Sequence, residues 1–255
     1  MTTVSRRRRA LRGAVLPVLL LLTWEVASRG GLVDPRILPP LETVAGVFRR
    51  ELARGDLPAD LAASLARDLA GFAIGTAAGL VLGALLGMSR LADRLLGPSF
   101  DGLKQVAAFA WIPLISVWFG VGEAAKVVFV ALAAFTPVVV NTCEGVRCAS
   151  RELLEVGRIL RLTRRQILTR ILLPSALPSI LTGIQLALIY SWLATVGAEY
   201  FMTVGPGIGG LVIEGRERFD MGLVMLGVGV LGVVGYAINR LAAAIGTRLA
   251  PWRQA

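Results

Sequence analysis

The sequence has no histidine and only two cysteines among its 255 residues. Without histidine, a Ser-His-Asp catalytic triad is excluded and the commonest transition-metal ligand is missing. Cys143 and Cys148 are five residues apart and would point to different faces of a helix, so neither a disulfide nor a metal pair is favoured. The chain also lacks a Gly-x-x-x-x-Gly-Lys-Ser/Thr phosphate loop. We therefore expect a non-catalytic chain that binds no ATP and holds no cofactor of its own.

Charge is missing from long stretches of this chain, which is 55% hydrophobic. A membrane-spanning helix needs about 20 mostly apolar residues. Five uncharged runs reach or approach that length, and a sixth candidate, Gly13 to Ser28, carries a single charge on Glu25. The uncharged runs are Leu69 to Ser89, Gln105 to Gly122, Val127 to Thr142, Ile171 to Ala198 and Met221 to Asn239. The sequence therefore predicts an all-α polytopic membrane protein with about six transmembrane helices.

The net charge of +10 would by itself suit a nucleic-acid partner, but its distribution indicates a lipid bilayer. With the N-terminus inside and six spans, the inner segments hold 17 of the 27 Lys and Arg residues and the outer segments hold seven. Cationic residues of membrane proteins gather in cytoplasmic segments. We therefore expect no nucleic-acid partner, both termini in the cytoplasm, a basic N-terminus at 1–12 and a single transmembrane domain at 13–255. The first span is expected to stay uncleaved, because no small-x-small pattern precedes Trp24.

Proline and glycine indicate the shape of several segments. Leu41 to Ala53 is expected to form a short amphipathic helix on the outer side. Arg90 to Leu96 is expected to be a short inner turn, after which Gly97-Pro98 restarts the chain. The third span, Gln105 to Gly122, is expected to be kinked at Pro113, because proline removes a backbone hydrogen bond.

A glycine stripe follows one face of the second span. Gly71, Gly75 and Gly79 recur every four residues and are followed by Gly83 and Gly87. Small residues let helices approach closely in lipid. We interpret the stripe as a face for helix packing, with a conformational hinge as the alternative.

A charged helical stretch, Glu155 to Pro174, lies between the fourth and fifth spans. If residues 151–162 are helical, their apolar residues align at i, i+3 or i+4, and i+7. Such a helix could lie flat on lipid headgroups or dock into a groove of a cytoplasmic partner. Thr163 is the expected N-cap of a second short helix.

The order of residues in this stretch resembles a known family loop. The residues that carry the resemblance are Glu155, Val156, Gly157, Ile171, Leu173 and Pro174. They resemble the EAA loop of permease subunits in binding-protein-dependent ABC importers, where Glu-Ala-Ala, three residues, Gly and nine residues precede Ile-x-Leu-Pro. The spacing here matches without a gap. Val156 and Gly157 replace the two alanines, and Arg161 stands where the family has the glycine of the turn.

Further motifs extend the resemblance over nearly the whole chain, to the nitrate, taurine, sulfonate and bicarbonate group of these permeases. They are Trp24-Glu25, Ile37-Leu38-Pro39, Ser64-Leu65-x-Arg67, Gly71-Phe72, Ala110-Trp-Ile-Pro-Leu114, Trp118-Phe-Gly120-x-Gly122, Asn141-Thr142, Pro174-x-x-x-Pro178, and Ala198-Glu199 ahead of Gly207-Ile-Gly209. Each motif is weak alone, and the assignment depends on their order and spacing.

The resemblance implies the permease subunit of an ATP-driven importer in a bacterial inner membrane. It implies an assembly in which two permease copies surround a pathway, cytoplasmic ABC ATPase subunits bind ATP, and a solute-binding protein docks outside. The coupling loop would cover about 147–173, and the implied coupling residues are Glu155, Val156, Gly157, Arg158, Arg161 and Pro174. The implied substrate is a small anion, with an aliphatic sulfonate or taurine favoured over nitrate, bicarbonate or another small organic solute.

Several polar residues are candidates for the pathway or its gate. Gln185, Tyr190 and Ser191 could line the path in the fifth span, and helix–helix hydrogen bonds explain them equally well. Glu199 is a candidate at the membrane edge, but a carboxylate would repel an anion. We therefore favour its pairing with an arginine or its capping of the outer loop. Arg67 could gate the outer face or pair across spans, and we favour pairing.

Other classes of protein fit less well. A self-sufficient secondary transporter would need ion-coordinating carboxylates at mid-span, which the uncharged runs disfavour. A membrane-embedded enzyme would need a nucleophile–base pattern, which the sequence does not show. An exporter or an amino-acid-type permease of the wider ABC group stays an alternative.

Overall fold

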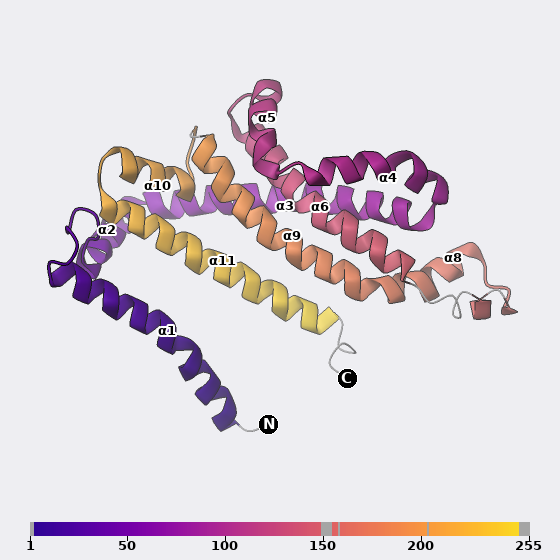
Figure 1. Cartoon of the computed structure of the whole chain (residues 1–255), viewed down its shortest axis with the longest axis horizontal. Coiled ribbons are helices and arrows are strands. Elements are labelled where there is room, and N and C mark those ends of the chain that lie inside the picture. Colours follow the sequence, from indigo (N-terminus) through magenta and orange to yellow (C-terminus); the bar gives the residue numbers. More distant parts are fainter. Residues whose placement is uncertain (1–2, 149–154, 158, 203, 250–255) are drawn as a thin grey trace. The chain divides into compact units, whose positions relative to one another are not determined.

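The structure is a computed structural model that describes residues 3–148, 155–157, 159–202 and 204–249. Within these ranges the chain forms helices and turns, without a strand (Figure 1). The elements are α1 (Thr3–Arg29), α2 (Leu41–Arg54), α3 (Asp56–Met88), α4 (Arg90–Gln105), η1 (Ala108–Trp111), α5 (Ile112–Phe119), α6 (Glu123–Arg147), α8 (Arg164–Ile167), η2 (Leu168–Leu172), α9 (Leu173–Phe201), α10 (Ile208–Glu217) and α11 (Met221–Leu249). The predicted all-α fold is confirmed.

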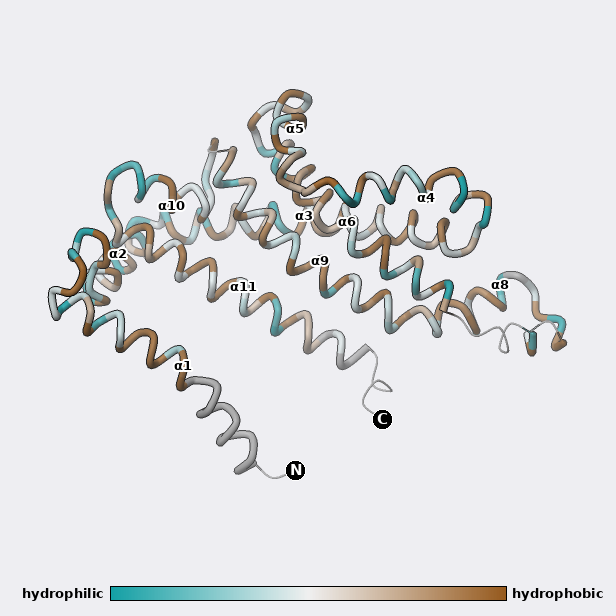
Figure 2. Tube along the Cα trace, in the orientation of Figure 1, coloured by the Kyte–Doolittle hydropathy of each residue, from teal (hydrophilic) through white to brown (hydrophobic). Residues whose placement is uncertain are grey.

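Four helical segments are long and apolar enough to cross a membrane. They are α3, α6, Arg165–Phe201 (which contains α9) and Met221–Ala244 of α11, and Figure 2 shows hydrophobic residues recurring along them. A fifth span results if α4 and the η1–α5 pair form one broken crossing. The predicted first span, Gly13 to Ser28, lies within α1, which is outside this set. Four to five of the expected spans are therefore supported by length and composition in the described residues.

The chain divides into two compact units, residues 1–58 with 211–229 and residues 59–210 with 230–255. In the first unit, α1 holds the start of α2. The Trp24 indole N–H donates to the Pro39 carbonyl oxygen at 2.8 Å, and the Leu41 N–H donates to the Glu25 carboxylate at 3.0 Å. The expected short helix from Leu41 is confirmed as α2.

In the second unit, the glycines of α3 receive side chains of α6. A Cβ added at Gly79 would lie 2.8 Å from the Val138 Cβ, and one at Gly83 would lie 2.7 Å from the Thr142 Cβ. Gly71, Gly75 and Gly87 meet Val130, Ala134 and Val146 in the same way. Because both partners advance by four residues from one contact to the next, the two helices run parallel. The interpretation of the stripe as a packing face is confirmed.

Helix α9 packs antiparallel along α6 (Figure 1). Gly183 of α9 lies against Asn141 of α6, while Gly145 further along α6 lies against Ser179 near the start of α9. The Ser179 hydroxyl also donates to the Asn141 carbonyl oxygen at 2.8 Å. At the other end of the pair, the buried apolar cluster contains Ala125, Phe129, Val130, Ala194, Ala198 and Met202.

The segment after α3 differs from the prediction. Arg90 to Leu96 is the first part of α4 and not a short turn. Ser89 caps this helix by accepting a hydrogen bond from the Ala92 N–H at 3.2 Å. The amphipathic pattern, with Phe100 buried, continues the helix through Pro98.

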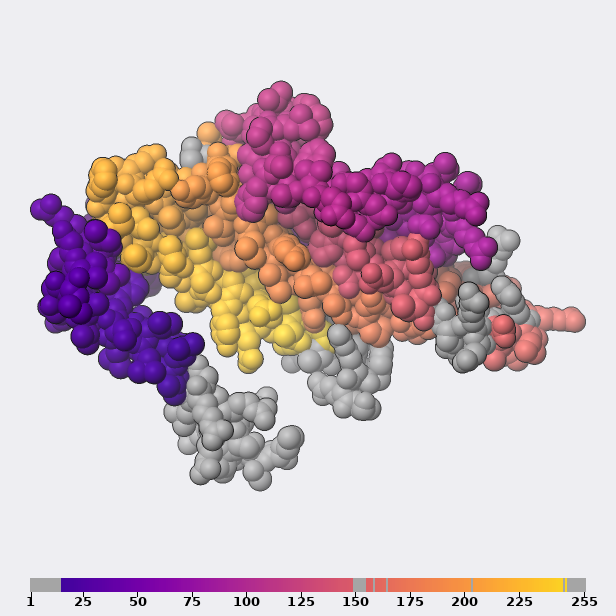
Figure 3. All heavy atoms as spheres, in the orientation of Figure 1, coloured from indigo at the N-terminus to yellow at the C-terminus, as the bar shows by residue number. Residues whose placement is uncertain are grey.

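The predicted third span is also wrong as one kinked helix. Helix α4 ends at Gln105, and η1 with α5 continues at an angle of 98°. The break lies at Val106 and Ala107, ahead of the proline. Pro113 occupies the first turn of α5, where its missing N–H removes no helical hydrogen bond. Figure 3 shows the atoms of α4 and α5 in magenta on the surface of the second unit.

Candidate functional site

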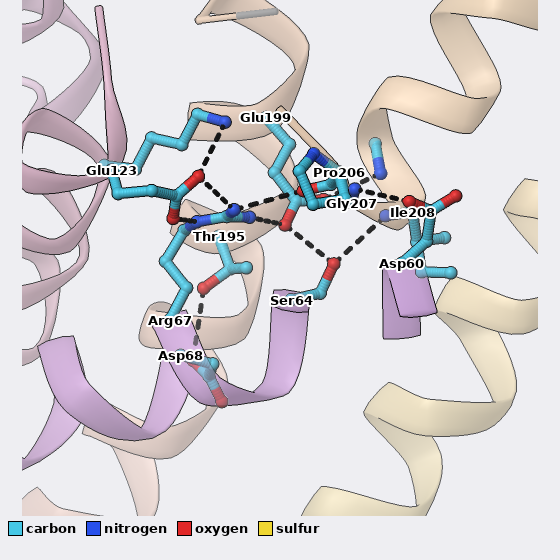
Figure 4. A network of polar contacts seen from close by, with 12 residues as sticks. Asp60, Ser64, Arg67, Asp68, Glu123, Thr195, Glu199, Pro206, Gly207 and Ile208 are labelled. Atoms are coloured by element: carbon cyan, nitrogen blue, oxygen red, sulfur yellow. Dashed lines mark hydrogen bonds and ion pairs between the residues drawn. The ribbon is translucent and has the colours of Figure 1, made fainter. Parts of the chain in front are cut away.

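Arg67 of α3 lies at the centre of a buried network of charged side chains (Figure 4). Its guanidinium donates to the two carboxylate oxygens of Glu123 at 2.8 and 2.7 Å and also to Glu199. Its Nη2 donates in addition to the Pro206 carbonyl oxygen at 3.1 Å. The side chains of Arg67 and Glu199 are 1% and 2% exposed, whereas that of Glu123 is 59% exposed. The expected pairing of Arg67 across spans is confirmed, and its buried partner is Glu199.

Glu199 also holds the glycine-rich loop that follows α9. Its carboxylate accepts hydrogen bonds from the Ser64 hydroxyl and from the Gly209 N–H, both at 2.7 Å. The Ser64 oxygen in turn accepts from the Ile208 N–H at 3.0 Å. A Cβ at Gly207 would lie 2.6 Å from the Glu199 carboxyl carbon, so the loop must be bare of a side chain there. Glu199 therefore both pairs with an arginine and caps the loop after α9, the two roles that the sequence offered as alternatives.

Lys126 completes the network from α6 and was not predicted. Its side chain is 1% exposed, donates to the Val204 carbonyl oxygen, and lies 3.6 Å from a Glu123 carboxylate oxygen. The Gly207 N–H donates to an Asp60 carboxylate oxygen at 2.9 Å. The feature of the sequence that could have identified Lys126 is the Glu-x-x-Lys spacing at the start of an otherwise uncharged run, because this spacing places the Glu123 and Lys126 side chains on one helix face.

The network joins the starts of α3 and α6 to the end of α9 and its following loop. Its two cations, Arg67 and Lys126, lie against the buried carboxylate of Glu199 and the more exposed carboxylate of Glu123. Removing one partner of such a buried pair leaves an uncompensated charge, which is costly. The arrangement is suited to fixing helix ends in place. Among the described residues, no group of three or more His, Cys, Asp or Glu side chains could hold a metal ion.

The loop between α6 and α9 lies at the opposite end of these helices and turns at Arg161. The φ of Arg161 is 50°, in the left-handed region. This conformation costs a non-glycine residue about 1–2 kcal/mol. The Leu162 N–H donates to the Gly157 carbonyl oxygen at 2.9 Å and closes the turn. Arg161 thus adopts the backbone conformation that a glycine adopts most easily.

A capping box begins the helix that follows this turn. The Gln166 N–H donates to the Thr163 hydroxyl oxygen at 3.3 Å, and the Thr163 N–H donates to the Gln166 side-chain oxygen at 2.8 Å. These reciprocal bonds satisfy two backbone donors at the start of α8. The expected N-cap at Thr163 is confirmed.

The three residues at the Glu-Ala-Ala positions differ in exposure. Glu155, Val156 and Gly157 are helical; the first two are exposed, and the glycine is buried. A Cβ at Gly157 would lie 2.8 Å from the Ile171 Cδ1 atom, so the small residue allows a close contact within the loop. The exposed pair is free to contact another molecule.

The other two predicted coupling residues are placed differently. Arg158 lies outside the described residues. Pro174 lies in the first turn of α9, where proline is tolerated. A π-helical turn, Leu168–Leu172, connects α8 to α9.

Residues 75–254 match the family described as binding-protein-dependent transport system inner membrane component. The chain belongs to this family. It is 34% identical to SsuC of Bacillus subtilis (strain 168) over 95% of this chain and 88% of that protein, and 38% identical to SsuC of Escherichia coli (strain K12) over 86% and 83%. Both relatives are named for the transport of aliphatic sulfonates. Permeases named for bicarbonate, taurine and nitrate match 61%, 62% and 66% of this chain.

The fold of the permease is also similar to a solved structure of the MetNI methionine ABC transporter in an inward-facing conformation. The TM-score is 0.59 at 19% identity, over 77% of this chain and 95% of that chain. At this identity the likeness concerns the fold alone. Family and fold together make the chain an ABC importer permease, a multi-pass protein of the inner membrane. It is one component of a transport system that depends on a binding protein.

The candidate pathway residues of the permease have separate environments. The Gln185 amide donates to the Ala242 carbonyl oxygen of α11 at 3.5 Å, and the buried Ser191 hydroxyl donates to the Leu188 carbonyl oxygen at 3.1 Å. Tyr190 lines a cavity of about 400 Å³ bounded by α4, η1, α6 and α9. The structure brings these three residues to no common site, and their role in a pathway stays a prediction.

Proposed function

We propose that two copies of this permease form the transmembrane pathway of an ATP-driven importer for a small organic anion. Cytoplasmic ATPase subunits bind and hydrolyse the ATP, and the permease itself is non-catalytic and holds no cofactor. Both termini lie in the cytoplasm, and an extracytoplasmic solute-binding protein delivers the substrate. The region 13–255 acts as one transmembrane domain.

The observation that carries this proposal is the geometry of the loop after Glu155. An exposed helical segment there precedes a left-handed turn at Arg161 and a capped second helix. An exposed apolar side chain, Val156, lies beside the charge of Glu155. An apolar anchor with an adjacent charge suits docking of a short helix into a groove on an ATPase. In this role Glu155 transmits force and performs no chemistry.

The test is Glu155→Lys in the assembled transporter, reconstituted in proteoliposomes with its ATPase and binding protein. We expect substrate uptake and binding-protein-stimulated ATP hydrolysis to fall together by roughly tenfold or more, as for loss of a central interface contact. Glu144→Lys, at an exposed position in α6, is the matched control and should retain both activities. Wild-type coupling in the Glu155 variant would overturn the proposed docking role.

Aliphatic sulfonates are the proposed substrates, with taurine in the same chemical class. The relatives named for aliphatic sulfonates match 95% and 86% of this chain, more than those named for bicarbonate, taurine or nitrate. Uptake of labelled ethanesulfonate, taurine, nitrate and bicarbonate by the reconstituted transporter distinguishes these substrates. Import of nitrate or bicarbonate alone would contradict the sulfonate assignment. Uptake that proceeds without ATP would instead favour a secondary transporter.

A further inference from the structure

The cavity beside Tyr190 has a mostly apolar wall. The apolar residues that the argument uses are Leu103, Val106, Ala108, Trp111, Ala133 and Leu186. They come from α4, the break after it, η1, α6 and α9. A cavity with this wall favours a ligand that carries an apolar part.

One cation and a few polar side chains lie in the same wall. Lys104 lines the cavity at the end of α4, with a side chain that is 34% exposed. Its ammonium group has three donors, and one of them is directed to Asp101 at 2.7 Å. Thr136, Asn141 and Tyr190 add polar groups. The cavity wall therefore includes a lysine, whose ammonium group is paired with Asp101, next to a large apolar surface.

The backbone also supports a binding role. Val106 and Ala107, at the break between α4 and η1, both line the cavity. Non-helical backbone at membrane depth is tolerated where it is buried in protein or lines a polar cavity. Discontinuous helices form many substrate sites of membrane transporters.

We propose that this cavity binds the alkanesulfonate during transport, with the alkyl chain on the apolar wall and the sulfonate group paired with Lys104. The proposal rests on the proposed function and assigns a site to it within the permease. An alkanesulfonate has an anionic head and an apolar chain, which match the two parts of the wall. Nitrate and bicarbonate lack the apolar chain and would leave that part of the wall uncovered.

The test measures binding to the permease–ATPase complex in lipid nanodiscs without the solute-binding protein, so that the permease site alone reports. Isothermal titration with ethane-, propane-, butane- and pentanesulfonate is corrected for empty nanodiscs. We expect affinity to rise by about fourfold for each methylene added, until the wall is covered. Nitrate and bicarbonate should bind more weakly than every member of the series.

Two variants separate the apolar wall from the cation. Ala133→Leu fills the cavity and should flatten the dependence on chain length. Ala124→Leu, the same substitution at an exposed position of α6 away from the cavity, should keep the wild-type slope. Lys104→Gln should weaken all four sulfonates by a common factor of roughly tenfold and leave the slope unchanged.

The outcomes distinguish this proposal from the proposed function. Import of sulfonates by the full transporter, without chain-length-dependent binding to the permease, would overturn the cavity site and leave the function intact. Equal slopes in the two alanine variants would also overturn it. No binding at all would show that another element, such as the second permease copy, covers the cavity in the complex, which equally refutes the proposal. Absence of any sulfonate import would instead refute the proposed function.

Discussion

Arg67→Met is expected to destabilise the permease strongly, because it leaves Glu199 without its nearest cation. The side chain of Glu199 is 2% exposed, and water cannot replace the lost guanidinium. Breaking a buried ion pair by removing one partner costs about 3–5 kcal/mol. Glu123, the second carboxylate bound by Arg67, is 59% exposed and remains solvated. The loss should therefore arise mainly from Glu199.

Two further variants test this assignment. Glu123→Gln removes the more exposed carboxylate but keeps a side-chain oxygen that can accept hydrogen bonds from Arg67 and Lys126, so it should cost less than Arg67→Met. Glu199→Gln added to Arg67→Met removes the unpaired buried charge but keeps oxygen and nitrogen atoms for hydrogen bonds with Ser64 and the loop. The double variant should therefore recover part of the stability lost in Arg67→Met.

The assay is unfolding of the purified permease in mixed detergent micelles, followed by circular dichroism. The free energies of unfolding of the wild type, Arg67→Met, Glu199→Gln and the double variant form a cycle whose coupling term isolates the buried pair. Equal losses for Arg67→Met and Glu123→Gln would refute the reasoning. Additive losses in the double variant would refute it as well, since they would mean that Glu199 gains nothing from its arginine.

Two other predictions concern glycine-like positions. Arg161→Gly should stabilise the turn by about 1 kcal/mol, because φ is 50° there, whereas Arg161→Val should destabilise it. Hydrogen exchange of the Leu162 amide measures the effect: it should be slower than in the wild type for the glycine variant and faster for the valine variant. Gly79→Ala should cost about 1–3 kcal/mol, because its Cβ would lie 2.8 Å from the Val138 Cβ, whereas Gly102→Ala in open space should gain up to about 1 kcal/mol from helix propensity. The same unfolding assay checks both alanine variants, and losses of equal size would contradict the packing argument.

The sequence predicted the pairing of charged side chains better than it predicted where helices are interrupted. Arg67 was expected to pair across spans and Glu199 to pair with an arginine or cap a loop, because isolated charges in apolar spans need compensation. That the two residues pair with each other is a finding of the structure. The sequence could not show that Lys126 is buried and Glu123 exposed, since the burial of each side chain depends on how α6 packs against its neighbours. The break at Val106 was missed because Pro113 indicates only that a helix is interrupted nearby, and the proline serves as a helix start.

The loop between α6 and α9 shows a different limit of sequence patterns. Thr163 was predicted as a cap from its type and position, and the capping box forms. Arg161 stands where the family has the glycine of the turn. The backbone nevertheless adopts a left-handed conformation, because the hydrogen bond from Leu162 and the cap at Thr163 fix the chain on either side. The arginine at this position therefore implies a conformational cost, but it does not change the left-handed turn of the backbone.

The parallel contact of α3 with α6 limits the motions open to the permease. Each of five successive glycines accepts one side chain, so sliding one helix past the other by a single residue would drive Cβ atoms such as that of Val138 into the facing backbone. The two helices therefore move as one rigid pair, which can tilt as a whole but in which neither helix can slide along the other. Any change between outward and inward openings must then move other elements of the permease relative to this helix pair.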